Sequence, residues 1–387
     1  MTAANGYKSF TPRLAKAAYN YQLSIKDPGG YVHGGKYIIE LVYASIADLN
    51  TKLTTQVDLS KAQRESSGRF DGAAAPFRHW DATGKIDAGC VKCHSTGGLP
   101  QLLAEGANTS QPIGNGLACA TCHNDLVKFT RYEVTAVAFP SGASLAFAND
   151  TDSNLCLECH QGRESTISVN KALAGQPPDT VNAKLAFKNV HYLTAGATLF
   201  GTEAKGAYDY AGKTYAGKFA HTKGLDSCKG CHDVHTQQVK VEVCKGCHGT
   251  DDPSKIRMNS KLDYDGNGDV TGGLASEVEG LKASLMTAIQ FYTKEVAKQS
   301  IVYSAAAYPY WFIDTNADGK LDPAEADVKN TYVLWTPRLL EAAYNFQYAN
   351  QDPGVFAHNG TYIMQILVDS IQDLGTRVNV TFKGKRP

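Results

Sequence analysis

Apolar positions are most regular near the two ends of the chain, where one pattern of helical spacing occurs twice. Residues 11–49 and residues 336–374 align at a constant offset of 325 residues without gaps, and 20 of the 39 positions are identical. In the first copy one face of the second half is apolar at helical spacing, through Ile38, Ile39, Val42, Ile46 and Leu49. The repeat therefore predicts an amphipathic helix at the end of each copy.

Start and turn signals predict that each copy is a helical hairpin. Thr11 and Thr336 are expected N-cap residues, and each precedes a proline at the first helical position. Asp-Pro-Gly sequences at 27–29 and 352–354 mark the turn between the two helices. His33 and His358 occupy the same place in the two copies, just before the second helix.

The apolar pattern is weak between the hairpins, and glycine is frequent, with 36 of 387 residues. We therefore expect long irregular segments and short helices over residues 70–250. A single long helix is expected from Leu274 to Lys298. The fold class predicted from these patterns is mainly irregular chain with α-helices, little β-structure and a helical hairpin at each end.

All ten cysteines lie in five Cys-x-x-Cys-His motifs, numbered one to five here in chain order. This pentapeptide attaches c-type haem: two thiols bind the vinyl groups of one porphyrin, and the histidine binds the iron. A single motif could be a zinc half-site or a redox dithiol, but five motifs that leave no cysteine over favour haem above free or disulfide-bonded thiols. The predicted covalent attachment residues are Cys90, Cys93, Cys119, Cys122, Cys156, Cys159, Cys228, Cys231, Cys244 and Cys247, and the predicted proximal ligands are His94, His123, His160, His232 and His248.

Six histidines lie outside the motifs and are candidate distal ligands for the five irons: His33, His79, His191, His221, His235 and His358. Because the spare histidines are at least as many as the irons, we expect every iron to be closed by two imidazoles, which allows electron exchange but leaves no position for a substrate. The count leaves room for only one of His33 and His358 within a subunit. We favour His358 there, and His33 serves either this chain or a haem of the next molecule.

The spacing of the motifs predicts which haems crowd together. Only eleven residues separate His232 from Cys244, so the fourth and fifth haems should lie close to each other. The long interval between the third and fourth motifs contains His191 and His221, and we expect it to supply ligands. The haems should form a chain through the molecule.

Two acidic loops between the haem motifs and the second hairpin are candidate calcium sites. Residues 314–325 match the twelve-residue EF-hand pattern, with Gly319 at the sharp bend. The predicted ligands are Asp314, Asn316, Asp318, the Lys320 carbonyl, Asp322 through water, and Glu325. In the earlier loop the predicted ligands are Asp263, Asp265, Asn267 and Asp269, with Glu277 as a displaced last ligand because the twelfth position is Leu274; the alternative is an acidic turn without an ion.

Four regions follow from these signals: an N-terminal hairpin module over 1–60, a pentahaem-binding region over 61–255, calcium loops with a long helix over 256–335, and a C-terminal hairpin over 336–387.

The formal net charge is zero and the pI is near 7.1, so nucleic acid is not an expected partner. No run approaches the roughly 18 apolar residues that span a bilayer. Residues 1–6 do not resemble a signal peptide, yet haem of this type is attached outside the cytoplasm. We therefore expect an exported, extracellular or cell-surface protein, with a periplasmic location as the alternative, whose numbering describes a processed chain.

Several segments resemble multihaem c-type cytochromes of extracellular electron transfer. These segments are Phe77-Arg78-His79-Trp80-Asp81, Cys159-His160-Gln161-Gly162-Arg163, the stretch from Val190 to Gly201, Cys231-His232-Asp233-Val234-His235 and the two Thr-Pro-Arg-Leu repeats. The resemblance covers most of the chain and implies covalent haems with bis-histidine ligation and an export pathway. Some relatives form filaments in which a histidine of one subunit binds a haem of the next.

The predicted function is extracellular electron transfer through five bis-histidine haems, without catalysis. The surplus histidine and the repeated ends favour a head-to-tail polymer of the chain, which also exchanges electrons with redox partners or extracellular acceptors. The alternative is a pentahaem reductase of a small nitrogen or sulfur oxyanion. Known pentahaem nitrite reductases generally replace a motif histidine by lysine, and the sequence has no such motif. A calcium-bound adhesive protein with incidental haems is disfavoured by the number of motifs.

Overall fold

The computed structural model describes residues 6–59, 62, 74–114, 116–191, 193–222, 224–258 and 260–387. The chain forms two compact units, residues 1–71 with 234–238 and residues 72–233 with 239–387. The region boundary predicted at residues 60 and 61 lies outside the described residues. The described chain is mainly helical and irregular with short strands, which confirms the predicted fold class.

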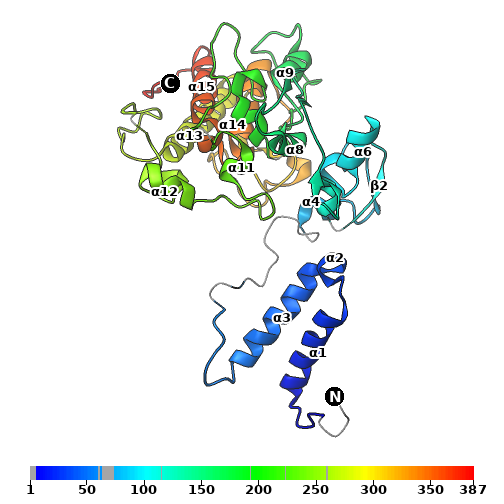
Figure 1. The fold of residues 1–387 in the computed structure, drawn as a ribbon. Coiled ribbons are helices and arrows are strands. Elements are labelled where there is room, and N and C mark those ends of the chain that lie inside the picture. Colours follow the sequence, from blue (N-terminus) through cyan, green and yellow to red (C-terminus); the bar gives the residue numbers. More distant parts are fainter. Residues whose placement is uncertain are drawn as a thin grey trace. The chain divides into compact units, whose positions relative to one another are not determined.

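The first unit contains an antiparallel helical hairpin (Figure 1) made of α1 (Pro12–Lys26), the short α2 (Gly30–His33) and α3 (Gly35–Asn50). Thr11 caps α1 as predicted, because its hydroxyl accepts the Leu14 amide at 3.2 Å. The two long helices are tied by polar contacts, with Arg13 3.1 Å from Asp48 and Asn20 donating to Ser45 at 3.0 Å. No residue of α1 or α3 is buried. The apolar face expected on α3 is therefore only partly covered.

The second copy of the hairpin consists of α14 (Pro337–Gln351) and α15 (Val355–Gly375). Thr336 caps α14 in the same way, accepting the Leu339 amide at 3.2 Å. Helix α15 has a break at Asn359, where φ is −165°, and the first copy breaks at the equivalent Gly34, where φ is −175°. In contrast to the first copy, nearly all of α14 and most of α15 are buried.

The region of the haem motifs is built from short elements. Its helices are α4 (Ala75–Arg78), α5 (Val91–His94), α6 (Gly98–Glu105), α7 (Cys119–Cys122), α8 (Thr151–His160), α9 (Thr166–Leu173), α10 (Ala195–Phe200), α11 (Cys228–Cys231) and α12 (Glu242–His248), with 3-10 turns at Gly201–Glu203 and Pro253–Lys255. Its strands form three two-stranded antiparallel ladders: β1 (Lys85–Ile86) with β2 (Gln111–Pro112), β3 (His123–Asp125) with β4 (Thr130–Arg131), and β5 (Val137–Ala138) with β6 (Ser144–Leu145).

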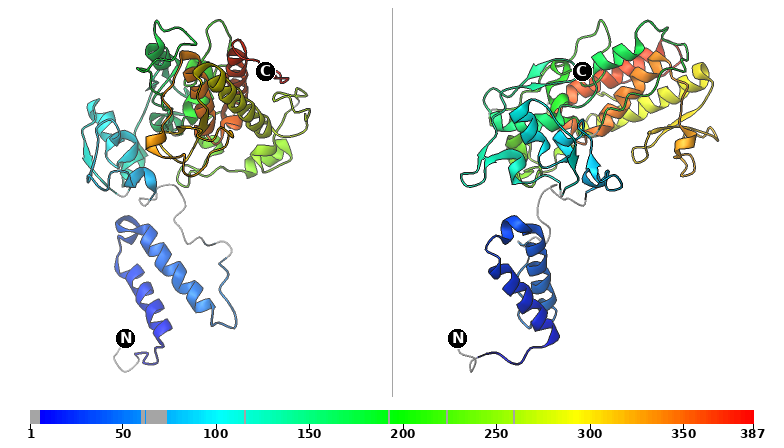
Figure 2. Two further views of the ribbon diagram at one scale, coloured as in Figure 1. Left: turned by 180° about the vertical axis from the view of Figure 1, so that it is seen from behind. Right: turned by 90° about the vertical axis from the view of Figure 1, so that its right-hand side faces the viewer.

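The main apolar core lies where α13 (Leu274–Tyr292), α14 and α15 run side by side, with α10 against α15 (Figures 1 and 2). The predicted long helix continues beyond α13 as a π-helical turn, Thr293–Ala297, and ends at Lys298. A fourth ladder of β7 (Ile301–Tyr303) and β8 (Trp311–Ile313), followed by a 3-10 turn at Val328–Asn330, adds Trp311 to the core. In the part of the chain that the structure describes, no helix has the length and apolar character needed to cross a membrane.

Candidate haem-binding sites

Each of the five motifs contains a helical turn that places its two thiols on neighbouring positions of one face. Motifs one, two and four form the isolated turns α5, α7 and α11, whereas motif three ends α8 and motif five ends α12. All ten cysteines are free of disulfides, and each residue is at least partly exposed. The thiols of each motif are therefore free and spaced for attachment to a porphyrin edge.

Three motif histidines are oriented by main-chain carbonyls. The Nδ1 atoms of His94, His123 and His160 lie 2.9, 3.0 and 3.0 Å from the carbonyl oxygens of Pro76, Phe129 and Leu193 respectively. An imidazole whose Nδ1 donates to a carbonyl presents the lone pair of Nε2, which is the arrangement of a metal-bound histidine.

Two of these carbonyls come from residues in a rare backbone conformation. Phe129 has φ of 53° and Leu193 has φ of 61°. Such left-handed conformations cost side-chain-bearing residues about 1 kcal/mol or more and concentrate at functional sites. His191, two residues before Leu193, also has a positive φ, 63°. The backbone thus has a positive φ both at His191, which supplies one imidazole, and at Leu193, whose carbonyl orients another.

Three pairs of imidazoles face each other at the separation that a bis-histidine haem requires. The ring centres of His94 and His191 are 6.1 Å apart, those of His221 and His248 6.1 Å, and those of His232 and His358 6.3 Å. Two imidazoles on opposite sides of a metal, each with a nitrogen–metal bond of roughly 2 Å, have centres about 6 Å apart. Each pair joins one motif histidine to one of the spare histidines named from the sequence.

Among the other spare histidines, His79 lies beside an aromatic side chain close to the first motif. His79 packs edge-on against Trp80, at 5.0 Å between ring centres, and Trp80 in turn lies 5.2 Å from His94. His33 and His235 belong to the first unit.

Burial keeps several of these imidazoles neutral, which is the form that binds iron. Burial lowers the pKa of His94 and of His160, and it lowers the pKa of His191 to about 4, with the positive charge of Arg163 adding to the shift. A cavity of about 360 Å³ adjoins His191 and is lined by Arg163, Phe187 and Lys188, among others. The surroundings of this histidine combine an apolar ring with basic groups.

His358 is held by a carboxylate instead of a carbonyl. Its Nδ1 lies 2.7 and 2.9 Å from the two oxygens of Asp352, which is almost fully buried. Burial acts to lower the pKa of His358, but Asp352 outweighs it and the pKa is raised. The first copy repeats the pair, with His33 Nδ1 3.0 Å from both oxygens of Asp27. A carboxylate on Nδ1 makes an imidazole a stronger donor to a metal through Nε2.

Glycine in the turn before each histidine leaves space for the imidazole ring in its present position. A side chain at Gly354 would place its Cβ 2.7 Å from the His358 ring, and one at Gly29 would place it 2.6 Å from the His33 ring. The Asp-Pro-Gly turn therefore does two things that were not apparent from its turn chemistry alone: it supplies the carboxylate and leaves space for the imidazole.

Motifs one and three lie against each other, although 65 or so residues separate them. The Cys93 thiol is 3.9 Å from the Glu158 carbonyl, the Cys159 thiol is 4.0 Å from the Lys92 carbonyl, and interaction with the Cys159 thiol lowers the pKa of Cys93. The Lys92 ammonium is 3.1 Å from the Glu158 carboxylate. The x positions of both motifs, which the sequence left unassigned, thus fix how the two motifs meet.

Motif three also contacts motif four through the other end of α8. Interaction with the Cys228 thiol lowers the pKa of Cys156, and Lys229 reaches Asp150 at 2.7 Å and Asp152 at 3.0 Å. Burial and, to a lesser extent, the Cys156 thiol raise the pKa of Cys122, and burial and the Cys244 thiol raise the pKa of Cys231. Motif two is therefore near motif three, and motif four is near motif five.

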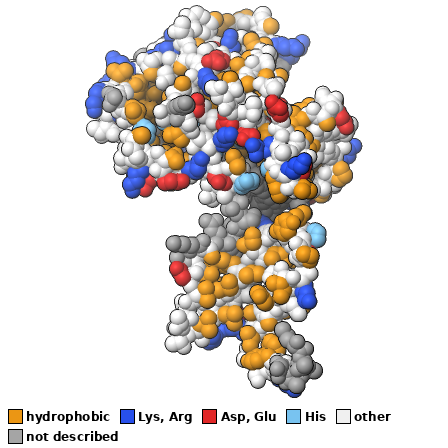
Figure 3. Space-filling model, viewed as in Figure 1, with side chains coloured by type: hydrophobic (Ala, Val, Ile, Leu, Met, Phe, Trp, Pro, Cys, Tyr) orange, Lys and Arg blue, Asp and Glu red, His pale blue; other side chains and the backbone are white. Residues whose placement is uncertain are grey.

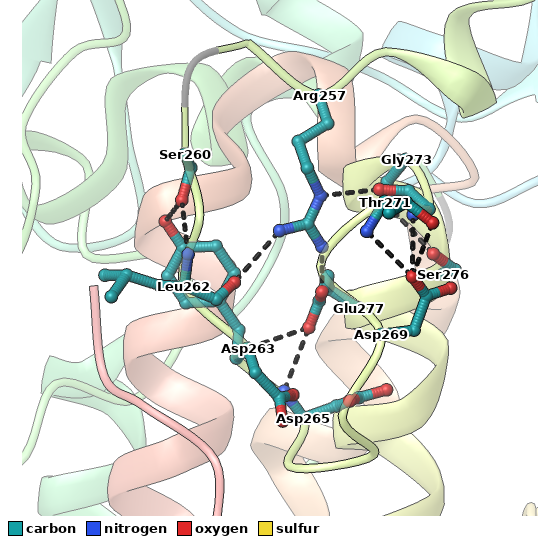
Figure 4. A network of polar contacts seen from close by, with 12 residues as sticks. Arg257, Ser260, Leu262, Asp263, Asp265, Asp269, Thr271, Gly273, Ser276 and Glu277 are labelled. Carbon is teal, nitrogen blue, oxygen red and sulfur yellow. Dashed lines mark hydrogen bonds and ion pairs between the residues drawn. The ribbon is translucent and has the colours of Figure 1, made fainter.

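The first acidic loop, shown in Figure 4, brings three of its predicted calcium ligands together. Ligand oxygens of Asp263, Asp265 and Glu277 all lie within 4.8 Å of one another. Burial raises the pKa of Asp265, and neighbouring Asp263 adds to the shift, as expected where two carboxylates lie close together. Glu277, the displaced last ligand, also accepts the Tyr264 and Asp265 amides and pairs with Arg257. Asp269 and Asn267 are engaged elsewhere: Asp269 accepts the Thr271 amide, and the Asn267 oxygen accepts the Asp269 amide.

In the second acidic loop, the residues at the first and twelfth positions, Asp314 and Glu325, are buried and accept backbone hydrogen bonds. Glu325 accepts the Thr315 amide at 2.6 Å and the Asp322 amide at 3.0 Å, and Asp314 accepts the Gly319 amide at 2.9 Å through one oxygen. The other oxygen of Asp314 is buried without a hydrogen-bond partner, which suits a cation. Gly319 has φ of 78°, the bend expected from the motif. Asn316 donates to Asp322 at 3.0 Å, and Asp318 accepts the Lys320 amide at 2.8 Å.

Comparisons with known proteins agree with the motif chemistry. Residues 75–161 match the family described as cytochrome c7 and related cytochrome c. The chain is 27% identical to the C-type polyheme cytochrome OmcC of Geobacter sulfurreducens, over 94% of this chain and 52% of that protein. It is 29% identical to the C-type polyheme cytochrome OmcB of the same species, over 73% of this chain and 37% of that protein. The chain thus spans about half or less of the length of these relatives. No solved structure matches the chain.

Proposed function

We propose, from the premise that this chain is a multihaem c-type cytochrome, that it conducts electrons through five haems that are each closed by two histidines. The observation that carries the proposal is the set of three facing imidazole pairs at 6.1–6.3 Å. An iron closed on both sides accepts and passes on electrons but offers no position to a substrate. His191, His221 and His358 are accordingly assigned to the first, fifth and fourth haems.

Contacts between the motifs support a spatial order of haems that differs from their order in the sequence. Motif three touches motif one through Cys159 and motif four through Cys156. Motif five lies beyond motif four, and motif two lies beside motif three. We infer a path one–three–four–five with the second haem as a branch at the third.

The ligation can be tested with His191→Ala in the full-length holoprotein, compared with Lys184→Ala, which changes an exposed residue of the same irregular segment. Electron paramagnetic resonance of the ferric wild type should show only low-spin haem. His191→Ala should convert one haem in five to high spin, and Lys184→Ala should convert none. A His191→Ala protein with all haems low-spin would contradict the assignment. High-spin haem and ligand-induced shifts in the wild type would instead favour the reductase.

His33 has the same carboxylate support as His358 but is 70% exposed at its side chain, whereas His358 is 23% exposed. We infer that His33, or the hairpin around it, serves a haem of a neighbouring subunit, so that the haem row continues in a head-to-tail polymer outside the cell. His33→Ala in the assembled protein tests this by electron microscopy together with the spin state. Unchanged filaments with entirely low-spin haem would exclude a ligand role between subunits.

Both acidic loops are assigned calcium with a structural role. The support is the carboxylate cluster of Asp263, Asp265 and Glu277 in one loop and the unpartnered buried oxygen of Asp314 in the other. Both loops flank α13, so an ion in each would hold the helix that packs on the C-terminal hairpin. Isothermal titration of chelator-treated protein should give two calcium-binding events, and Asp314→Asn should remove one of them.

A further inference from the structure

The first helix of the C-terminal hairpin binds main chain outside the hairpin through three polar side chains. The Tyr344 hydroxyl donates to the Gly206 carbonyl at 2.7 Å. Asn345 accepts the Tyr208 amide at 2.7 Å and donates to the Tyr208 carbonyl at 3.0 Å. Gln347 accepts the Val190 amide at 2.8 Å. Helix α14 therefore holds two parts of the segment 190–208 by their backbone.

All three side chains are identical in α1, where they are Tyr19, Asn20 and Gln22. Tyr19 is 69% exposed and Gln22 is also exposed. Asn20 donates a hydrogen bond to Ser45 inside the first hairpin, and Asn345 donates the equivalent hydrogen bond to Ser370 inside the second. The contact within the hairpin is thus repeated in both copies. The side chains that bind main chain outside the hairpin in α14 are instead exposed to solvent in α1.

Two positions of α14 that bind side chains outside the hairpin have changed in α1, whereas Arg338, which pairs with Asp179, is retained as Arg13. Glu341, which accepts the Tyr208 hydroxyl at 2.8 Å, is replaced by Lys16. Tyr348, whose hydroxyl accepts from Thr198 at 3.3 Å, is replaced by Leu23. Backbone amides and carbonyls are the same in every sequence, so a face that keeps its main-chain-binding side chains can bind an extended segment with other side chains.

The second helix of the hairpin does not keep this ability. Asn359 and Gln365 bind the Gly217 carbonyl and the Ala216 amide, and their counterparts are Gly34 and Glu40. The retained binding face is therefore confined to α1. Figure 3 shows apolar side chains gathered on the visible face of the hairpin formed by α1 and α3.

The segment 190–208 of the same chain is already bound by α14, so α1 requires an extended segment elsewhere. Charge indicates which molecule supplies it. The first hairpin carries the basic residues Arg13, Lys16, Lys26 and Lys36 against three acidic residues, while the second carries Arg338 against four. A copy of the chain carrying five haems gains the negative charge of their propionates, which complements the first hairpin.

We propose that α1 docks on a second copy of this chain and that Tyr19, Asn20 and Gln22 form hydrogen bonds to the main chain of an extended segment of that copy. The inference rests on the proposed function, because a haem row that continues between subunits needs a defined contact at this hairpin.

The test compares the full-length holoprotein with the double variant Tyr19→Phe, Gln22→Ala, in which both changed side chains are exposed and the hairpin contacts stay intact. Sedimentation velocity across a concentration series should show self-association of the wild type, weakened about tenfold or more in the double variant, as the loss of two hydrogen bonds implies. The matched control is Ile25→Asn, which replaces a 58% exposed apolar residue of α1 by the residue of the second copy and should leave association unchanged.

A wild type that stays monomeric, or a control that weakens association as much as the double variant, would overturn the proposal. Redox titration and the haem spin state of the same samples report on the proposed function separately. A monomer with five low-spin haems that exchanges electrons would refute the docking and leave electron conduction intact.

Discussion

Two hairpins with 20 identical residues in 39 have opposite surroundings in this molecule. Tyr344 in the second copy is fully buried, while its counterpart Tyr19 in the first is 69% exposed. The capping threonines, the Asp-Pro-Gly turns and the carboxylate–histidine pairs are nevertheless the same in both. The comparison shows that the hairpin's own sequence determines its local geometry, and that burial comes from α13 and the segment 190–216 around the second copy.

The largest expected effect concerns the buried tyrosine. Tyr344→Ala should lower the free energy of unfolding by about 3–5 kcal/mol, because it opens a cavity and leaves the Gly206 carbonyl without its donor. Tyr19→Ala should change it by less than about 0.5 kcal/mol in dilute solution. Urea titration followed by circular dichroism measures both. Equal losses in the two variants would mean that the first hairpin is packed as tightly as the second.

A pH-dependent difference between the copies is expected next in size. Burial raises the pKa of Glu341 to about 7 from its usual 4.5. The folded state therefore favours the protonated acid. The stability that this preference adds is fully present below about pH 4.5 and is lost as the pH rises through 7. Glu341→Gln should remove about 1–3 kcal/mol of this pH dependence between pH 5 and 8.

The control for that experiment is Lys16→Gln at the equivalent exposed position of α1, whose urea midpoint should follow the wild type at each pH. A Glu341→Gln variant with the same pH profile as the wild type would show that the buried acid does not titrate in this range.

The carboxylates behind the two histidines should differ in their effect on the haems. Asp352→Asn should raise the potential of one haem by roughly 60 mV, the shift that a tenfold change in affinity for one oxidation state gives in a one-electron couple. The reason is that a neutral amide makes His358 a weaker donor to ferric iron. Asp27→Asn should leave all potentials unchanged in dilute protein. Spectroelectrochemical titration distinguishes the two results.

The smallest difference is expected at the helix caps. Thr336→Ala should lower the free energy of unfolding by about 1–2 kcal/mol, because the buried hydroxyl caps α14 and also lies 2.9 Å from the Tyr292 hydroxyl. Thr11→Ala removes only an exposed cap and should cost about 0.5–1 kcal/mol. Thermal unfolding of the two variants compares them directly, and a larger loss at Thr11 would contradict the ranking.

Much of the local structure was predictable from short-range signals. Thr11 and Thr336 cap their helices, the turns lie where Asp-Pro-Gly places them, and α13 begins at Leu274 as expected. These features depend on residues within a few positions of one another, whose chemistry is independent of the rest of the fold. The predicted helix end at Lys298 was nearly correct, but its last turn is π-helical.

Pairings across long stretches of chain were not predictable from spacing. Nothing near His191 indicates that its ring faces His94, and the meeting of motifs one and three depends on Lys92 and Glu158, which are variable positions of the motif. The carboxylate behind His358 was visible as the Asp of the turn, since the same Asp precedes His33 by the same six residues. That repeated spacing was the one sequence signal of this hydrogen bond.

The facing of His232 and His358 joins the fourth motif to a residue more than a hundred positions later in the chain. His221 and His248, by contrast, are close in sequence and can meet early in folding. Closing a long loop is slow and entropically costly, so the fifth motif can complete its surroundings while the fourth must wait for the last hairpin to be synthesised and to collapse onto it. Maturation of the molecule thus has a built-in order, in which the hairpin of α14 and α15 decides when the fourth motif is finished.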